Sequence, residues 1–391
     1  MNDRARVAMK FLIALAAAAA VLAAYMVGYR DDSAAKTDFI SYWAAGHQLV
    51  RGQNPYDIQA VRALEIAVGR DPGVPVLMMR NPPLAFFMAL PLGWVAPKAG
   101  LILWDFFLIG ILGLASRLLW RINGRPDSLL NFFGFAFPPA VACLMAGQTG
   151  ILLLLGLVLF LYLFKDRPFL AGVSLLLCAL KPHCFVPFGI ALLLWCVTAK
   201  RGYRILGGFG VALLGSCVLA YAIDPHAWAQ YQAMMRAGGA LNEIVPKLSA
   251  QLRRAIDPHA VWIQFVPEIA ASIWTVWYFW TRRKSWDWMD HGMILLLVGA
   301  ICAPFGFLTD ETMLLPAILA GAYRCIESRR PLWPLAVLTV VGVLELEMGA
   351  TIVSPYYLWT TPAWLCWYLY ATGRFSRRTA APARSLQPRQ V

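Results

Sequence analysis

Long apolar runs recur from one end of this chain to the other, and they restrict what it can fold into. Hydrophobic residues make up 60% of the 391 residues, charged residues only 14%, and the mean hydropathy is +0.61. A soluble domain of this length cannot hide so much apolar surface from water. The runs are also too many for a soluble domain with one anchor. We therefore predict an all-α polytopic membrane protein.

Twelve apolar segments can be drawn along the sequence. Several are shorter than the roughly 20 residues that a full membrane span needs. The short ones come in pairs around tight turns, so they are either tilted helices or re-entrant hairpins shielded by neighbouring protein. The segments cover residues 10–28, 100–119, 129–145, 149–164, 168–180, 184–198, 204–223, 260–281, 290–304, 312–325, 332–349 and 355–371.

The basic residues indicate which connections face the cytoplasm. Of the 34 Lys and Arg residues, 22 lie in an alternating set of connections and at the two ends of the chain. The positive-inside rule places this set, and both termini, in the cytoplasm. The net charge of +13 is then mostly a topology signal, and we expect no nucleic-acid partner. The set comprises residues 4–10, 117–125, 165–167, 200–204, 282–284, 324–330 and 374–389.

The opposite face receives the long connections. Residues 29–99 form a first outer excursion and residues 224–259 a second, which suggests a site built on that face. We predict one polytopic domain over residues 1–373 and a basic, disordered cytoplasmic tail over residues 374–391. The first apolar segment, Phe11–Val27, follows basic residues as a signal peptide does. Because Ala23-Ala24-Tyr25 is a poor cleavage site, we expect a retained helix.

The eight cysteines lie almost entirely inside apolar segments and form no CxxC pair. They read as small buried hydrophobes, and their spacing gives no metal site.

Asp38 is the most informative polar residue, because it stands about ten residues beyond the first apolar segment. It opens an amphipathic segment, Asp38 to Leu49, with aromatic residues at helical spacing. Gly52 ends this helix, and the turn at Asn54-Pro55 restarts a helix over Ile58–Val68. Asp38 has two compatible interpretations, a helix cap or a functional carboxylate.

Further polar residues fall in outer turns between short apolar segments: Gln148, Lys181, His183, Asp310 and the pair Arg253-Arg254. Such groups cost free energy unless they face water or a partner. Lys181 either extends its ammonium to the interface or binds an anionic headgroup. His183 is a weaker candidate, because a lone histidine at an interface usually has no special role.

These residues together resemble glycosyltransferase family 87, polytopic enzymes of the GT-C fold. The similarity runs in order along most of the chain. It rests on Asp38, Tyr42-Trp43, Gly46, Gly52-Gln53-Asn54-Pro55-Tyr56, Pro82-Pro83-Leu84, Pro91, Gly147-Gln148, Lys181-Pro182, and Pro304-Phe305 through Leu314-Leu315-Pro316. Thr309-Asp310-Glu311 stands where many members carry histidine, and no Asp-x-Asp pair supports a metal-dependent mechanism.

The resemblance implies a GT-C-like bundle of about twelve transmembrane or re-entrant helices with outer-face amphipathic helices. It implies transfer of a hexose, mannose foremost, from a polyprenyl-phosphate donor to a lipid or glycan acceptor, with inversion and without metal or cofactor. Asp38 would be the general base and Lys181 the partner of the donor phosphate, with Arg80, Arg253 and Arg254 as alternatives. Gln148, Asp310, His183, Tyr42, Trp43 and Tyr56 would contact the sugar or the acceptor.

The location implied is the inner membrane of a bacterium, with the site facing the periplasm. Two rival functions remain open. A transporter or flippase of a lipid-linked sugar would share the lipid-phosphate site, but the sequence has no inverted repeat. A non-catalytic membrane scaffold would tolerate free replacement of the outer acids and Lys181.

Overall fold

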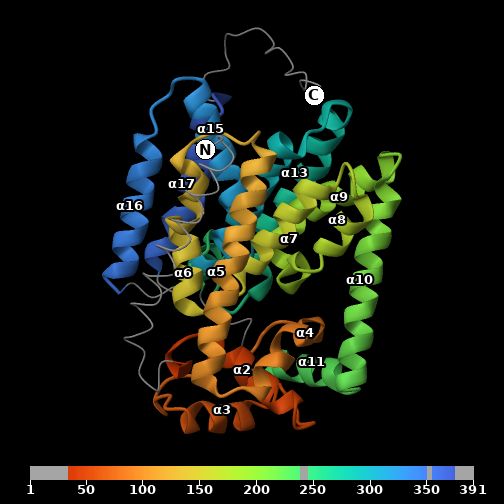
Figure 1. The fold of residues 1–391 in the computed structure, drawn as a ribbon, viewed down its shortest axis with the longest axis vertical. Coiled ribbons are helices and arrows are strands. Elements are labelled where there is room, and N and C mark those ends of the chain that lie inside the picture. Colours follow the sequence, from red (N-terminus) through yellow and green to blue (C-terminus); the bar gives the residue numbers. More distant parts are fainter. Residues whose placement is uncertain (1–33, 238–244, 350–354, 375–391) are drawn as a thin grey trace, which may run out of the picture.

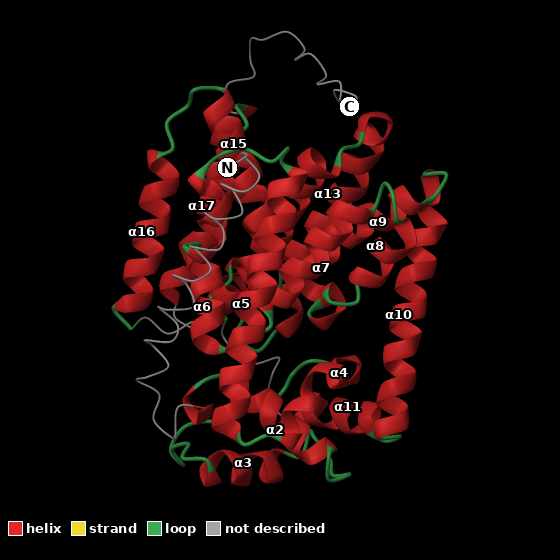
Figure 2. Ribbon diagram, viewed as in Figure 1, coloured by secondary structure: helices red, strands yellow, loops and turns green. Residues whose placement is uncertain are grey.

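The computed structural model describes residues 34–237, 245–349 and 355–374. Every regular element in these ranges is a helix, and none is a strand, as Figure 2 shows. The prediction of an all-α polytopic membrane protein is confirmed. The first apolar segment, the amino terminus and the tail from residue 375 lie outside the described residues.

Three helical stretches are long and apolar enough to cross a membrane, judged by length and composition among the described residues. They are α5 (Pro97–Ile122), Leu129–Ala146, which joins η4 (Leu129–Phe135) to α6 (Pro138–Ala146), and α10 (Gly202–Ile223). Helix α10 exposes Val211, Leu214 and Val218 along one side. Such an apolar stripe on the outside of a protein indicates contact with lipid.

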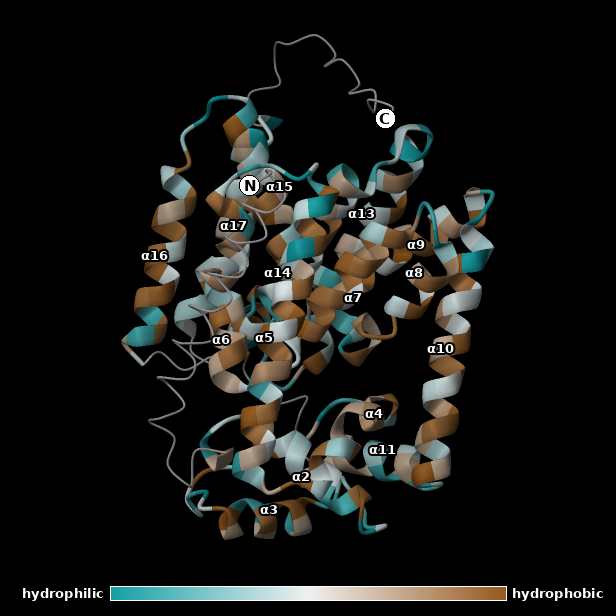
Figure 3. Ribbon diagram, in the orientation of Figure 1, coloured by the Kyte–Doolittle hydropathy of each residue, from teal (hydrophilic) through white to brown (hydrophobic). Residues whose placement is uncertain are grey.

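Each remaining apolar segment in the described ranges also contains a helix, but a shorter one. The clearest is α7 (Gly150–Leu163), which has almost all of its side chains buried by neighbouring helices. Figure 3 shows the apolar residues concentrated in this bundle. The other elements are α8 (Pro168–Ser174), η5 (Cys178–Leu180), η6 (Pro182–Phe185), α9 (Val186–Thr198), η8 (Val261–Phe265), α13 (Val266–Arg282), η9 (Arg283–Ser285), η10 (Trp288–Gly292), α14 (Met293–Cys302), η11 (Leu308–Leu314), α15 (Leu315–Glu327), α16 (Trp333–Glu347), η12 (Pro355–Trp359) and α17 (Thr360–Ala371).

The two outer excursions form helices at one end of the bundle, as Figure 1 shows for α2, α3, α4 and α11. The first contains η1 (Ala34–Lys36), α2 (Phe39–Leu49), α3 (Ile58–Ala67), η2 (Pro83–Ala85), α4 (Phe86–Ala89) and η3 (Leu90–Trp94), and the second contains α11 (Ala227–Ala237) and α12 (Leu248–Ile256). Helix α3 exposes one face, whereas α2 is buried on nearly every side. The segment after Asp38 is therefore enclosed by protein.

Candidate active site

The turn Gly147-Gln148 fixes the centre of the site. Gly147 ends α6 with φ +66°, a left-handed conformation that glycine adopts without a steric penalty. A Cβ at this position would stand 2.8 Å from Phe39 Cβ, so the turn packs directly against α2. The indole of Trp104 on α5 donates a 2.8 Å hydrogen bond to the Gly147 carbonyl. The turn is thus held between α2 and α5.

Asp38 lies immediately before α2 and is tied to this turn twice. Its backbone N–H donates to the Ala146 carbonyl at 2.9 Å, and its Oδ2 accepts a 2.7 Å hydrogen bond from Gln148 Nε2. Its side chain makes no capping bond to α2. Within the described parts of the chain, Oδ1 has no hydrogen-bond partner. One carboxylate oxygen is therefore oriented and the other is available to a ligand.

Gln148 connects Asp38 to three further predicted site residues. Its Oε1 accepts hydrogen bonds from Tyr42 OH at 2.9 Å and, more weakly, from Lys181 Nζ at 3.4 Å. Lys181 Nζ also donates to Asp310 Oδ1 at 2.6 Å. Asp310 Oδ2 accepts from the backbone N–H of Phe307 at 3.0 Å. Five candidate residues from four separate segments thus form one continuous polar network.

Burial and charge move the two carboxyls of this network in opposite directions. Burial raises the pKa of Asp38, against the opposing effects of the Gln148 hydrogen bond and the Lys181 charge. Burial alone would raise the pKa of Asp310 too, but the adjacent Lys181 ammonium holds it below its ordinary value. Asp310 is therefore a fixed anion, while Asp38 has the stronger proton affinity that a general base needs.

A second buried ion pair stands beside the first. Lys247 Nζ, from the second excursion, donates to Glu311 Oε1 at 2.8 Å, and Thr360 Oγ1 donates to the same oxygen at 2.9 Å. The two charged side chains are only 3% and 2% exposed. Asp310 and Glu311 are consecutive in η11, so this turn holds both lysines. Lys247 was not among the predicted site residues, because nothing near it in sequence marks it as buried.

Gly150 allows the turn that carries Asp310 to approach the Gly147 turn. A Cβ on Gly150 would stand 2.1 Å from the Thr309 carbonyl oxygen. The start of α7 therefore packs backbone to backbone against η11, which brings Gln148 and Asp310 within reach of the same lysine.

Trp43 and Tyr56 do not join the network. Trp43 Nε1 donates to the Val95 carbonyl, and Tyr56 OH donates to the Asn81 carbonyl. Asn81 Nδ2 in turn donates to the Leu180 carbonyl at 3.0 Å, just before Lys181. Tyr56 thus positions the segment that leads to the site.

The predicted arginines are dispersed. His183 stands near the network: burial lowers its pKa to about 4, and the charges of Asp310 and Lys181 act on it in opposite directions. Arg80 is exposed and directly precedes Asn81 in the chain. Arg253 Nε and Nη1 donate to Pro258 and Gln264, within the second excursion and the segment after it. Arg254 is exposed on α12. His183 packs edge-on against Phe305, with ring centroids 6.2 Å apart.

No three or more His, Cys, Asp or Glu side chains lie together as a candidate metal site in the described ranges. A cavity of 330 Å³ lies elsewhere, and no residue of the polar network lines it.

Fold and composition define the class as an all-helical polytopic membrane protein. Residues 80–304, more than half of the chain, match the model of Glycosyltransferase family 87. The chain belongs to this family and is a membrane glycosyltransferase. The matched stretch includes Gln148 and Lys181, whereas Asp38 and Asp310 lie outside it. No curated protein and no solved structure gives a significant match.

Proposed function

We propose that this glycosyltransferase moves a hexose, mannose foremost, from a polyprenyl-phosphate donor to a lipid or glycan acceptor at the periplasmic face of a bacterial inner membrane. The observation that carries the proposal is the pairing of an available carboxylate oxygen on Asp38 with the Lys181–Asp310 ion pair through Gln148. A displacement at an anomeric carbon needs a base for the acceptor and positive charge for the leaving phosphate.

In the proposed reaction, the acceptor oxygen attacks the anomeric carbon and its proton passes to Asp38 Oδ1. The bond between the anomeric carbon and the phosphate oxygen breaks, the configuration inverts, and the lipid phosphate departs with the bonding electrons. The raised pKa of Asp38 favours this proton transfer.

The leaving phosphate is assigned to Lys181. A lysine ammonium has three donors, and Asp310 and Gln148 take two of them, which leaves one for a phosphate oxygen. Exposed Arg80, which precedes Asn81 in the chain, is an alternative cation for the phosphate. We assign no metal to the reaction, since these side chains and Lys247 supply positive charge.

The test is transfer of labelled sugar from a panel of polyprenyl-phosphate sugars by the purified protein. Asp38→Asn keeps the size and a hydrogen bond with Gln148, and we expect transfer to fall by roughly 10²–10⁴ with donor binding retained. Asp57→Asn is the matched control: Asp57 lies in the same excursion and caps α3, a role that asparagine also fills. Near-normal turnover in Asp38→Asn overturns the assignment. Passage of the donor across vesicles without product would identify a transporter.

A further inference from the structure

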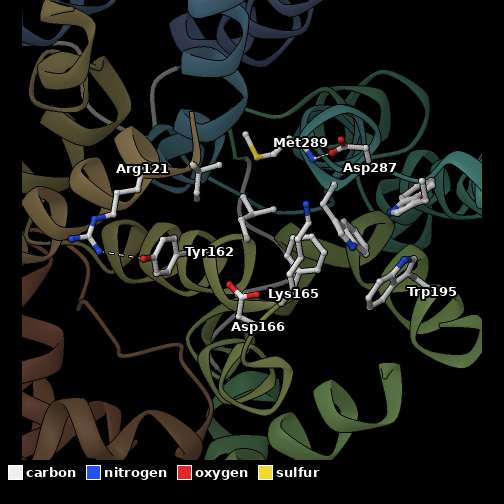
Figure 4. A pocket seen from close by; sticks show the side chains of 12 residues that line it. Arg121, Tyr162, Lys165, Asp166, Trp195, Asp287 and Met289 are labelled. Atoms are coloured by element: carbon white, nitrogen blue, oxygen red, sulfur yellow. Dashed lines mark hydrogen bonds between the residues drawn. The ribbon is translucent and has the colours of Figure 1, made fainter. Parts of the chain in front are cut away.

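A pocket of 330 Å³ lies at the far end of the bundle from Asp38, among residues that the proposed reaction does not use. Figure 4 shows Arg121, Tyr162, Lys165, Asp166 and Trp195 around it. The connection after α13 contributes Trp286, Asp287, Trp288 and Met289. The volume falls in the range of small-molecule sites.

The length of helix α5 gives the separation between this pocket and the candidate active site. Trp104 near its start binds the Gly147 turn, while Arg121 at its end lines the pocket. Seventeen residues of α-helix separate the two, which corresponds to about 25 Å along the axis. The pocket is therefore a distinct site.

The pocket wall carries buried N–H donors that lack acceptors. Arg121 Nε, Trp286 Nε1 and Trp288 Nε1 are buried without a hydrogen-bond partner in the described residues. Trp288 is only 2% exposed. Elsewhere, Trp43 and Trp104 donate to backbone carbonyls, whereas Trp364 Nε1 is also buried without a partner in the described residues. Buried donors without acceptors cost free energy. These three are closed to solvent while the pocket is empty, so a ligand meets first the exposed side chains of the wall, Lys165 and Asp166.

Local structure holds these donors in place. Trp288 opens η10, a π-helical turn, and Asp287 Oδ1 caps it by accepting from Met289 N–H at 2.6 Å. Such turns interrupt regular helices and frequently occur at functional sites. The Trp288 ring packs against Phe160, Phe188 and Trp286, with centroids 4.8–5.4 Å apart. The Trp288 ring is thus a fixed part of the pocket wall.

The charged side chains of the pocket wall further restrict the class of ligand that fits. Arg121 and Lys165 are cations, while Asp166 and Asp287 are carboxylates. A ligand that joins a phosphate to an amine meets both signs, with the phosphate at the cations and the amine at a carboxylate. The pocket lies where apolar α5 and α7 end, which is the depth of lipid headgroups for a membrane-spanning bundle.

We propose that this pocket binds the headgroup of a phospholipid that carries both phosphate and amine, as in phosphatidylethanolamine. Arg121 and Lys165 hold the phosphate, and Asp166 faces the amine. The proposal does not depend on the sugar-transfer reaction.

Native mass spectrometry of the full chain in a neutral detergent tests the proposal. The ligands are phosphatidylethanolamine, phosphatidylglycerol and diacylglycerol with identical acyl chains, and soluble glycerophosphoethanolamine. We expect phosphatidylethanolamine to bind most tightly, phosphatidylglycerol more weakly, and diacylglycerol and the soluble headgroup at least about tenfold more weakly than phosphatidylethanolamine. Arg121→Gln and Lys165→Gln should each weaken both phospholipids by about tenfold.

Matched variants separate the pocket from general effects. Arg117→Gln removes an exposed cation one turn earlier on α5, and Trp364→Phe removes a buried, unpartnered indole N–H away from the pocket, so neither should change binding. Asp166→Asn should abolish the preference for phosphatidylethanolamine. The proposal is overturned if diacylglycerol or the soluble headgroup binds as tightly as the phospholipid. It is equally overturned if phosphatidylglycerol matches phosphatidylethanolamine in the unaltered protein, or if Arg121→Gln and Lys165→Gln both behave like Arg117→Gln.

Discussion

Lys181 Nζ lies 2.6 Å from Asp310 Oδ1, although 129 residues separate the two in sequence. The side chains are 15% and 4% exposed, so water screens the pair little. A lysine at the tip of an apolar hairpin needs an anionic partner, and this one finds it within the chain. The pair can hold the fold, bind the donor phosphate, or do both, and variants of the two residues separate these roles.

Removing only the lysine should lower the free energy of unfolding. Lys181→Ala leaves Asp310 buried without its counter-charge, at a cost of about 3–5 kcal/mol in unfolding free energy. The double variant Lys181→Met/Asp310→Leu should recover most of that stability, because packed apolar residues often replace a buried pair without loss. Thermal unfolding in detergent measures both. If Lys181 binds phosphate, the double variant stays stable yet has a raised donor KM. Unchanged donor KM and kcat in the double variant would leave Lys181 with a structural role alone.

Activity should fall in acid as Asp38 becomes protonated. Only the carboxylate accepts a proton, and the pKa of Asp38 is raised, so kcat/KM should drop at a higher pH than for an ordinary aspartate. Gln148→Ala removes a hydrogen bond that opposes the shift, so it should move the acid limb to still higher pH. A pH profile that Gln148→Ala leaves unmoved would contradict the role of Gln148.

Folding stability should decline over a more acidic pH range than activity does. The pKa of Asp310 is lowered in the folded protein, so its contribution is complete above the unfolded value of about 3.9 and is lost as pH falls below it. Unfolding measured against pH should therefore show destabilisation at more acidic pH than the loss of activity. Stability and activity that decline together would show that acid inactivation is unfolding.

The Lys247–Glu311 pair should position η11. Lys247→Ala leaves Glu311 buried without its counter-charge and should lower the unfolding free energy by about 3–5 kcal/mol, with a loss of kcat through displacement of Asp310. Arg254→Ala, an exposed cation on α12, is the control and should change stability by less than about 0.5 kcal/mol. Equal melting temperatures for the two variants would rule out the positioning role.

The predicted topology places α3 outside the cell and residue 284 inside it. Gln59 and Lys284 are both exposed, and Gln59, unlike Asp57, accepts no capping bonds. In a Cys366→Ser background, an impermeant thiol reagent added to intact cells should label Gln59→Cys and not Lys284→Cys. The reverse pattern would invert the topology and place Asp38 in the cytoplasm.

Gly147→Ala should disrupt the site through the backbone. The new Cβ meets Phe39 and requires a left-handed conformation, so we expect a loss of about 1–3 kcal/mol in stability together with loss of transfer. Gly207→Ala, in α10 with open space around it, should be neutral or stabilising. Wild-type transfer by Gly147→Ala would show that the turn need not pack so closely on α2.

The helices were predictable because apolar runs and glycine or proline stops are local signals. Gly52 and the Asn54-Pro55 turn predicted the ends of α2 and α3 to within a residue. The network formed by Asp38, Gln148, Lys181 and Asp310 could be anticipated only as a set of polar residues in turns on one face. Their pairing depends on tertiary packing, which no local pattern encodes.

Two kinds of information were not accessible from sequence. Lys247 reads as an ordinary charged residue in a connection, and only the fold places it against Glu311. The amphipathic pattern of α2 suggested an interfacial helix, whereas α2 is buried on nearly every side and its Tyr42 hydroxyl donates to Gln148. A polar residue that is buried against a distant segment looks the same in a sequence pattern as a polar residue exposed to solvent. The pattern alone therefore does not distinguish the two.

The burial of α2 also sets an order of events during synthesis. Asp38 bonds to Gln148, which is synthesised 110 residues after it, and Lys181 pairs with Asp310, which is synthesised 129 residues after Lys181. Domains fold as the chain emerges, amino-terminal parts first, so α2 can pack on α3, η3 and α5 long before the Gln148 turn and η11 exist. A ribosome that stalls before η11 would leave Lys181 with no counter-charge. Quality-control proteases would then distinguish an unfinished chain, in which Lys181 lacks its counter-charge, from a finished one. The distinguishing feature is part of the candidate active site.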